Sequence, residues 1–283
     1  MKSLVSWCGL FGLVMALALP SLARAAGSHY HLIAHRGGVV ENKFPDNSEA
    51  ALNAAVARGY WGLEVDIRET KDGVLVMQHD PDLKRNFSDP RAINQITWDE
   101  MRGLRTTVAD QPPWRFEDLV KAAHREGLRL MLDSKDPHSS GFVEKVETVL
   151  RKYDMLDRCY IIGTADALKH FIGQALVGLK YRSLRPRLEA DPGLQDKYFL
   201  FDEGTTLTAE MVRWAQERGI KVVPSINAYH YFDPKTMQGK SREELAKLIL
   251  PLARRHIEAL KALGVTEFQI DSEFDGWFDL PAQ

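Results

Sequence analysis

Positions 61–80 combine acidic and basic side chains with a backbone pattern that brings them together. Glu64 and Asp66 stand two apart in an apolar run, so both carboxylates of a strand at this point share one face. An Asp-Gly pair at 72–73 indicates a hairpin turn, and the returning strand leads to His79. Two carboxylates on one strand face are costly unless water or a cation meets them, so this segment predicts a metal-dependent hydrolytic site.

Further polar side chains follow other strand-like runs. Asp133 comes at the end of such a run, and with Glu64 and Asp66 it gives three carboxylates on neighbouring strands. An all-oxygen set suits Mg²⁺ or Ca²⁺ better than zinc, although pairing with a nearby cationic side chain is the structural alternative. His35 and His79 are the natural acid–base pair, because imidazole titrates near neutral pH.

Two cationic residues accompany this acidic set. Arg36 directly follows His35, and Lys135 lies two residues after Asp133. Guanidinium and ammonium groups bind phosphate oxygens, and they also balance carboxylates. The residues therefore indicate phosphoester chemistry.

Strand-like runs alternate with helical patterns along the chain. Strands are predicted at 29–35, 61–67, 128–133, 158–162, 177–181, 198–201, 220–225 and 266–271, with 74–77 as an additional strand in a loop. Helices are predicted at 48–58, 115–126, 140–153, 165–174, 207–218 and 241–263, and a less regular pattern covers 185–195. Eight such units predict an α/β protein with a parallel eight-stranded (β/α)8 TIM barrel and a hairpin excursion after the second strand. An open, doubly wound sheet is the alternative.

Helix signals and breakers refine this pattern. Ser48, Ser241 and either Thr206 or Thr208 are expected to begin helices. Pro251 falls inside the last helical pattern, where it is expected to kink or split the helix. The non-periodic stretch 81–114 is expected to pack over one end of the barrel.

The predicted barrel also predicts where the active site lies, because active sites of such barrels are found at the carboxyl ends of the strands. The acidic and basic residues described above all fall at or near those ends. Later strands also end in polar residues, namely Asp202, Glu203, Asn227 and Asp271, and His230 follows the seventh strand. We therefore expect one site at this end of the barrel.

The N-terminus has the pattern of a secretory signal. Lys2 precedes a mostly apolar stretch, and an Ala-x-Ala cleavage pattern ends at residue 25. We predict a signal peptide over 1–25, a single barrel domain over 26–283, and a secreted or periplasmic protein without a stable membrane anchor after cleavage. An uncleaved anchor is the alternative.

Cys159 alone remains after cleavage, so no intramolecular disulfide is expected. The net charge of −2 argues against a nucleic-acid partner.

The motifs together resemble the glycerophosphodiester phosphodiesterase family. The resemblance covers nearly all of the predicted mature chain, and it is densest in residues 32–85. The matching segments are His35-Arg36-Gly37, Pro45-Asp46-Asn47-Ser48, Glu64-Val65-Asp66, Thr70-Lys71-Asp72-Gly73, His79-Asp80, Asp133-Ser134-Lys135 and 264–271.

The resemblance implies a (β/α)8 barrel that hydrolyses a glycerophosphodiester to glycerol 3-phosphate and an alcohol, with a divalent cation, Ca²⁺ or Mg²⁺. It also implies a role for each matching residue. The cation ligands would be Glu64, Asp66 and Asp133, the catalytic residues His35 and His79, and the substrate-binding residues Arg36, Lys135, Asn47 and Asn227.

Three departures from the family pattern concern the metal site and the substrate pocket. Asp46 and Ser48 stand where the family has Glu and Thr, and Asp133 stands where it has Glu. The segment 224–227 replaces a Trp-Thr-x-Asn pattern and so lacks an aromatic residue. Spider-venom sphingomyelinase D, a related barrel, also has Asp at the third ligand position.

Two other functions remain open at this point. A phospholipase D-like or sphingomyelinase D-like enzyme would act on intact lipids, and it would need an exposed apolar patch, for which Phe274, Trp277 and Phe278 are candidates. A non-catalytic phosphoester-binding barrel is the second alternative, but both histidines and all three acidic positions are filled. The alcohol group, the metal, the hydrolytic route and the oligomeric state are not specified by the sequence.

Overall fold

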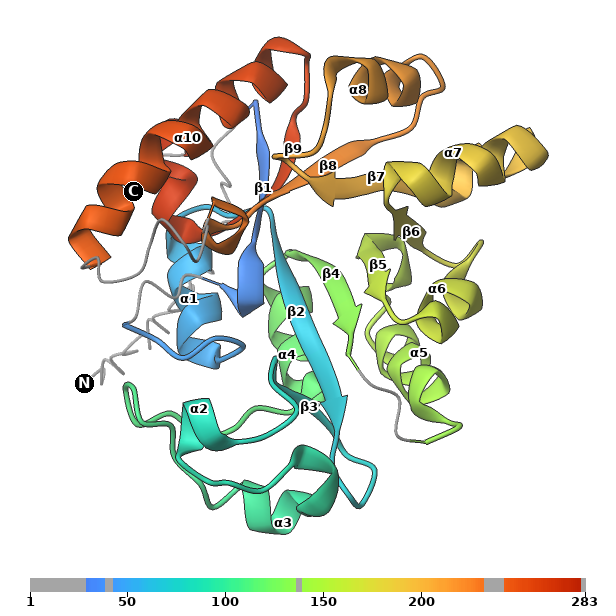
Figure 1. Ribbon diagram of the computed structural model, residues 1–283. Coiled ribbons are helices and arrows are strands. Elements are labelled where there is room, and N and C mark those ends of the chain that lie inside the picture. Colours follow the sequence, from blue (N-terminus) through green and yellow to red (C-terminus); the bar gives the residue numbers. More distant parts are fainter. Residues whose placement is uncertain (1–28, 39–42, 136–138, 232–241, 281–283) are drawn as a thin grey trace, which may run out of the picture.

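The eight parallel strands form a closed barrel in the computed structural model, which describes residues 29–38, 43–135, 139–231 and 242–280. Each strand pairs with the next in the order β1-β9-β8-β7-β6-β5-β4-β2, and β1 also pairs with β2, which closes the sheet (Figure 1). The strands are β1 His31–Ala34, β2 Gly62–Glu69, β4 Arg129–Ser134, β5 Cys159–Gly163, β6 Leu176–Leu179, β7 Tyr198–Glu203, β8 Val222–Ile226 and β9 Glu267–Ile270. The predicted barrel is confirmed, and the open sheet is excluded. The predicted signal peptide lies outside the described residues.

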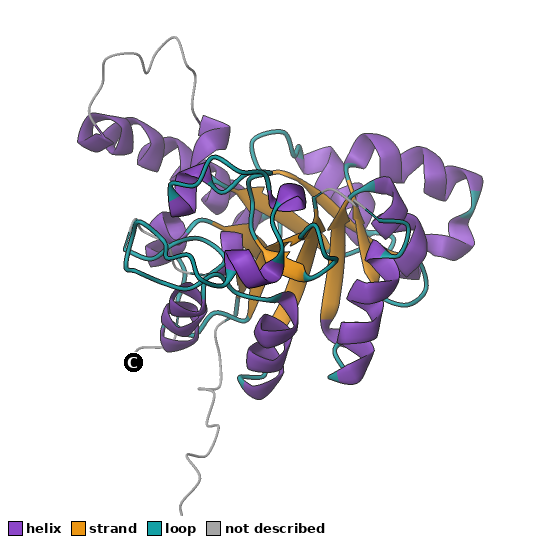
Figure 2. Cartoon of the chain, turned by 90° about the horizontal axis from the view of Figure 1, so that it is seen from below, coloured by secondary structure: helices purple, strands orange, loops and turns teal. Residues whose placement is uncertain are grey.

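Helices surround the barrel, with the strands enclosed between them (Figure 2). They are α1 Glu49–Ala57, α4 Phe116–Arg125, α5 Phe142–Lys152, α6 Ala165–Phe171, α7 Tyr181–Ala190, α8 Ala209–Gln216 and α10 Arg242–Ala262. None of the helices within the described ranges is both long enough and apolar enough to cross a membrane. The helix expected over 185–195 begins earlier, as α7, and ends before a 3-10 turn at Pro192–Lys197.

Pro251 does not split the last helix, so that part of the prediction is wrong. The helix α10 continues through the proline over 21 residues. Pro251 is exposed, whereas Ile249, Ala253 and Ile257 are buried against the core. The buried face packs against the core both before and after the proline, and these contacts hold the helix together.

Side chains at the helix starts confirm two expected caps. Ser48 Oγ accepts a hydrogen bond from the backbone N–H of Ala51 at the start of α1. Thr208, rather than Thr206, caps α8 by accepting from Met211. Each cap satisfies a backbone donor that has no partner within its helix. The predicted cap at Ser241 lies outside the described residues.

The segment that follows the hairpin strand β3 (Leu75–Met77) has a small apolar core of its own. It contains the short helices α2 (Lys84–Phe87) and α3 (Trp98–Met101), which lie together beside the ends of β2 and β3 (Figure 1). The buried side chains are Val76, Leu83, Ile93, Ile96 and Met101. This segment forms the hairpin excursion that the sequence predicts after the second strand of the barrel.

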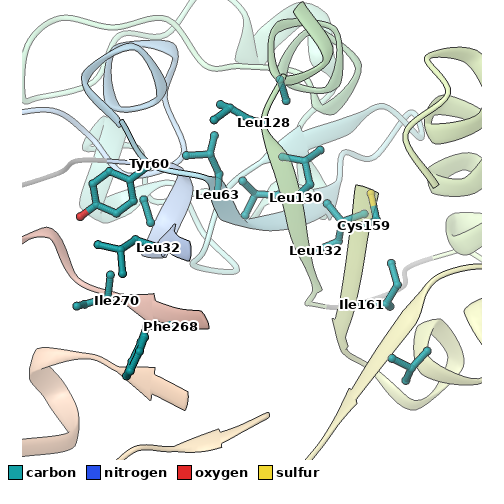
Figure 3. Packing of buried hydrophobic residues seen from close by; sticks show 14 of the residues in the cluster. Leu32, Tyr60, Leu63, Leu128, Leu130, Leu132, Cys159, Ile161, Phe268 and Ile270 are labelled. Atoms are coloured by element: carbon teal, nitrogen blue, oxygen red, sulfur yellow. The ribbon is translucent and has the colours of Figure 1, made fainter. Parts of the chain in front are cut away.

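Alternation along the strands decides which side chains reach the barrel interior. Leu130 and Leu132 of β4 point outward into the layer between strands and helices, as do Leu63 of β2 and Phe268 of β9 (Figure 3). Met131 belongs instead to a second cluster inside the barrel. Neighbouring residues face opposite sides of a strand, so residues two apart share a side. Asp133, two residues after Met131, therefore also faces the interior. The same rule turns Glu64 and Asp66 of β2 inward.

Cys159 lies in the outer layer and is buried, as predicted for a small core residue. Burial raises the pKa of its thiol far above the ordinary range. A thiol in this state is neutral and unreactive, so its role is packing.

Candidate active site

Three carboxylates converge at the carboxyl ends of β2 and β4. Asp66 and Asp133 are direct partners across the two strands, and Glu64 lies two residues before Asp66 on the same face. Each residue offers one carboxylate oxygen, and these three oxygens lie within 4.8 Å of one another. Glu64 and Asp66 are 2% and 1% exposed. The sequence predicts that these three side chains lie close together, and the barrel does bring them close together.

Lys135 balances part of this charge. Its Nζ lies 2.9 Å from Asp66 Oδ1 and 2.5 Å from Asp133 Oδ2. Burial opposes the charged form of Asp66, but the Lys135 ammonium outweighs burial and lowers the pKa of Asp66. The same carboxylates raise the pKa of Lys135 against the effect of burial, so this side chain stays charged.

Glu64 is the carboxylate that remains poorly balanced. Burial, reinforced by repulsion from Asp66, raises the pKa of Glu64 to about 8. Its Oε2 accepts a hydrogen bond of 2.8 Å from the backbone N–H of Arg36, and His35 Nε2 lies 3.9 Å away. An excess of buried negative charge among hard oxygen donors is what a divalent cation would neutralise. The donor set therefore fits Ca²⁺ or Mg²⁺.

His35 is held by an aspartate from the last strand. The residue follows β1, and its Nδ1 lies 2.6 Å from Asp271 Oδ1. The other carboxylate oxygen of Asp271 accepts a hydrogen bond of 2.6 Å from the backbone N–H of Ala228, which fixes the aspartate in turn. Burial lowers the pKa of His35, but the bond to Asp271 and the negative charges nearby outweigh burial, and the pKa is raised.

His79, which comes from the hairpin strand rather than from the barrel, is also held by an aspartate. It follows β3, and its Nδ1 lies 2.7 Å from Asp80 Oδ1. Arg85 Nε donates to the other oxygen of Asp80 at 2.5 Å, while Arg68 binds the backbone carbonyl of His79 at 2.7 Å. Arg85 outweighs the effect of burial and lowers the pKa of Asp80 to about 2. Both histidines thus use Nδ1 to bind an aspartate, and both line the same cavity.

Arg36 depends on the local backbone. Its φ of 55° is left-handed, and the two glycines that follow continue the sharp turn. A Cβ at Gly38 would lie 2.1 Å from the backbone oxygen of Ala51, so only glycine lets this loop pack on α1. The turn places the guanidinium between Asp46 and His79, at 3.5 Å from each.

The two asparagines singled out in the sequence occupy different places. Asn47 donates to Asp66 Oδ2 at 2.8 Å and accepts from the backbone N–H of Asp66 at 3.0 Å. It is buried behind the carboxylate and is not among the residues that line the cavity. Asn227 does line the cavity, and its amide donates to the hydroxyl of Tyr229 at 3.2 Å. Asn47 therefore positions a carboxylate, whereas Asn227 is placed to meet a substrate.

The cavity that these residues share has a volume of about 400 Å³. Its second wall comes from the ends of β6 to β9. That wall includes Lys180, Phe201, Asp202, Glu203, Tyr229, His230 and Gln269. Asp202, Glu203 and His230 were expected at the mouth, but Lys180, Tyr229 and Gln269 were missed. The alternation of Gln269 with the outward-facing Phe268 and Ile270 is the signal that predicts its inward direction.

A second cavity, of about 440 Å³, lies at the amino ends of the strands. Its buried carboxylate, Glu267, accepts from Lys221 Nζ at 2.5 Å and from the Tyr160 hydroxyl at 2.7 Å. These contacts satisfy the carboxylate within the protein. The unbalanced charge and both aspartate-bound histidines lie in the cavity at the carboxyl ends instead.

Comparisons with known proteins agree with this site. The family model "Glycerophosphoryl diester phosphodiesterase family" matches residues 35–158, which include both histidines and all three carboxylates. Human glycerophosphodiester phosphodiesterase 1 is 36% identical over 131 residues, which are 44% of this chain and 38% of the human protein. The mouse protein of the same name is 31% identical, and this chain covers 33% of it. The chain thus spans little more than a third of the length of these relatives.

A bacterial relative matches over a longer range. The glycerophosphodiester phosphodiesterase of Caldanaerobacter subterraneus is 24% identical over 212 residues, which are 68% of this chain and 84% of that protein.

Solved structures share the fold. An Oleispira antarctica phosphodiesterase in complex with the product sn-glycerol-3-phosphate superimposes with a TM-score of 0.64 at 18% identity, over 87% of this chain and 95% of that one. A glycerophosphodiester phosphodiesterase from Agrobacterium tumefaciens gives a TM-score of 0.64 at 14% identity, over 87% and 97% of the two chains. At these identities the likeness concerns the barrel alone. The family model over residues 35–158 and the sequence relatives support assignment to the glycerophosphoryl diester phosphodiesterase family, and the solved structures share its barrel fold.

Proposed function

We propose that this protein hydrolyses glycerophosphodiesters to glycerol 3-phosphate and an alcohol, in a reaction that depends on a divalent cation. One observation carries the proposal. Two aspartate-bound histidines, two cationic side chains and a three-carboxylate cluster line or border a single cavity. This combination is suited to phosphodiester cleavage, which needs proton transfer and stabilisation of negative charge on phosphoryl oxygens.

Glu64, Asp66 and Asp133 would hold the cation. When bound, Ca²⁺ or Mg²⁺ polarises a phosphoryl oxygen and stabilises the negative charge that develops there. The residues around the cluster keep the ligands in place, because Asn47 fixes Asp66 through two hydrogen bonds. The buried and poorly balanced Glu64 gives the site its affinity for positive charge.

His35 and His79 exchange protons with the substrate. One imidazole takes a proton from the attacking oxygen as the new P–O bond forms, and the other gives a proton to the alcohol oxygen as the old P–O bond breaks. Since each Nδ1 is bound to an aspartate, Nε2 is the nitrogen on each ring that exchanges the proton, and that of His79 also lies 3.5 Å from the Arg36 guanidinium. The attacking oxygen is either water or the glycerol 2-hydroxyl, which would give a cyclic phosphate that water then opens.

Arg36 and Lys135 bind the phosphate. The guanidinium of Arg36 lines the cavity beside His79, and the Lys135 ammonium stays protonated beside the carboxylates. Both groups offer donors to phosphate oxygens that carry negative charge before and during the reaction.

The packing of the C-terminal segment supports a water-soluble substrate over an intact lipid. Phe274 and Phe278 are 1% and 6% exposed, and Trp277 stacks on Phe274 with ring centroids 5.7 Å apart. These aromatic residues belong to the hydrophobic core and form no exposed apolar patch at the mouth. The features that a lipid-binding surface requires are therefore not supplied by this cluster.

We also propose that the protein acts outside the cytoplasm, on the basis of the signal-peptide pattern in residues 1–25. Expression in a bacterial host, fractionation, and N-terminal sequencing test this. A mature chain that starts near residue 26 in the periplasm supports the proposal, and an intact N-terminus in the cytosol contradicts it.

A coupled enzyme assay tests the proposed activity. Purified protein is incubated with glycerophosphocholine, glycerophosphoethanolamine and glycerophosphoglycerol, and the release of glycerol 3-phosphate is followed with glycerol 3-phosphate dehydrogenase. We expect release from at least one diester, and none from Glu64→Gln purified in the same way. Absence of release from every diester, in the presence of Ca²⁺ or Mg²⁺, would contradict the proposal.

A further inference from the structure

Four buried side-chain atoms around the active-site cavity have no hydrogen-bond partner within the described part of the chain. They are Arg36 Nε, Asn227 Oδ1, His230 Nδ1 and Gln269 Oε1. Native proteins pair nearly all of their buried polar atoms, because an unpaired one keeps its desolvation cost without compensation. Four such atoms around one cavity indicate groups that a ligand pairs.

Three of the four atoms come from neighbouring segments at the ends of β8 and β9. Asn227 directly follows β8, His230 lies in the 3-10 turn Ala228–Tyr231, and Gln269 is on β9. Strands β8 and β9 are neighbours, with Ser225 opposite Gln269. Asn227 and Gln269 are 1% and 2% exposed, so neither side chain is satisfied by bulk solvent. We call these three residues the β8–β9 wall.

The chemistry of the β8–β9 wall is that of a hydroxyl-binding surface. The free atoms of Asn227 and Gln269 are amide oxygens, which accept hydrogen bonds. Burial lowers the pKa of His230, and a hydrogen bond to the backbone of Ser225 engages its ring, so the unpaired Nδ1 is the nitrogen left for a ligand. A hydroxyl group both donates and accepts, and it can therefore pair with every member of the wall.

Other ligand groups fit this wall poorly. A quaternary ammonium or an acyl chain offers no hydrogen-bond donor and would leave the amide oxygens unpaired. The nearby carboxylates are already engaged, since Lys180 Nζ lies 3.1 Å from Glu203 and the backbone N–H of Tyr181 donates to Asp202 at 3.1 Å. The β8–β9 wall itself consists of two amides and an imidazole, so it offers no negative charge to a cationic head group.

We propose that the β8–β9 wall is a subsite for a polyhydroxylated group of the substrate, with Gln269 and His230 as specificity-determining residues. This inference rests on the proposed phosphodiesterase function. The polyhydroxylated group is either the glycerol of the diester or a polyol head group on the other side of the phosphate. Both present vicinal hydroxyls, and the experiment below distinguishes them.

The test compares hydroxylated substrates with matched deoxy analogues. In the head-group arm, glycerophosphoglycerol is compared with the propyl ester of glycerol 3-phosphate, through release of glycerol 3-phosphate. In the glycerol arm, glycerophosphocholine is compared with the phosphocholine ester of propane-1,2-diol, which keeps the 2-hydroxyl, through release of choline. The kcat/KM ratio of hydroxylated to deoxy substrate is measured in each arm.

The same ratios are measured in two variants, Gln269→Met and His230→Phe. These substitutions remove the unpaired Gln269 Oε1 and His230 Nδ1 and keep a side chain of similar volume. Gln95→Met is the matched control, because Gln95 is exposed and far from the cavity in the excursion after β3. Circular dichroism and thermal unfolding check that each variant is folded. His230 is only half-buried, so its variant keeps the test valid if Gln269→Met does not fold.

We expect the wild type to prefer the hydroxylated substrate about tenfold in one arm, the scale of one or two lost hydrogen bonds. The ratio should fall to about one in Gln269→Met or His230→Phe and stay unchanged in Gln95→Met. The arm with the preference identifies the bound group. Turnover with ratios near one in both arms, or ratios that persist in both variants, would overturn the inference alone. If the wild type hydrolyses none of the diesters, the proposed function and this inference fall together.

Discussion

Asp271 and His35 lie 236 positions apart in the chain, yet their side chains meet at 2.6 Å. Strands β1 and β9 pair in parallel, with Ala34 opposite Ile270, so the next residue on each strand comes to the same point at the barrel mouth. The contact exists because the first and last strands close the barrel. Closure therefore fixes the orientation of a histidine that we propose to be catalytic, in addition to completing the fold.

Replacing Asp271 by Asn should slow the reaction without preventing folding. The amide keeps the size of the side chain but removes the charge that orients and stabilises the His35 imidazole, so we expect a loss in kcat of about a hundredfold or more, with a small change in KM. Asp271 raises the pKa of His35, so the limb of the pH–rate profile governed by His35 should shift to lower pH in the variant. Steady-state kinetics between pH 5 and 9 measure both effects. A lower rate with an unshifted profile would indicate a purely structural role.

Removal of either histidine should abolish most of the activity. His35→Ala and His79→Ala are each expected to lower kcat by about a hundredfold or more, the usual effect of losing a general acid or base. The coupled assay measures this, with His124→Ala on the helix α4 as a control that should retain the wild-type rate. A near-wild-type His79→Ala enzyme would remove His79 from the mechanism.

The metal-free protein should lose stability as the pH rises, because folding raises the pKa of Glu64 from 4.5 to about 8. Between these values the unfolded chain releases the Glu64 proton and the folded chain retains it. The contribution of Glu64 is thus fully present below about pH 4.5 and is lost as the pH rises through 8. Urea unfolding in a chelating buffer at pH 5, 6.5 and 8 measures the effect. The decline should be smaller in Glu64→Gln, and equal declines in the two proteins would refute this assignment.

The length of the side chain at position 133 should matter less than its charge. Asp133 borders the cavity, so there is room for one more methylene, and Asp133→Glu should keep measurable activity with a changed preference between Ca²⁺ and Mg²⁺. Asp133→Ala should be inactive because it removes one of three oxygen donors. Activity assays with each metal separate the two variants. If Asp133→Glu is as inactive as Asp133→Ala, the site is built tightly around aspartate.

Much of the fold and the central carboxylates could be predicted from local pattern. The period of two along a strand places Glu64 and Asp66 on one face, and the rule that barrel sites lie at strand ends brings Asp133 to them. These inferences need only local sequence and one topological rule. The unbroken helix at Pro251 was missed because the stabilising contacts of its buried face are tertiary.

The partners that orient the site residues were not predictable in the same way. The contact of Asp271 with His35 depends on barrel closure, and the hold of Asn47 on Asp66 depends on a left-handed backbone at Asn47 and on the packing of a loop against β2. Gln269 is a different case, because its alternation with Phe268 and Ile270 indicates an inward side chain but not which groups it meets there. Such pairings arise from the register between distant segments, which local residue pattern does not encode.

Metal dependence is the most direct test of the proposed mechanism. The protein is treated exhaustively with a chelator and dialysed, and glycerol 3-phosphate release and thermal unfolding are measured before and after Ca²⁺ or Mg²⁺ is restored. We expect activity to disappear on chelation and return with the cation, and the unfolding temperature at pH 8 to rise with the cation in the wild type but much less in Glu64→Gln, since a ligand that binds only the folded state stabilises it. Full activity after exhaustive chelation would contradict the account.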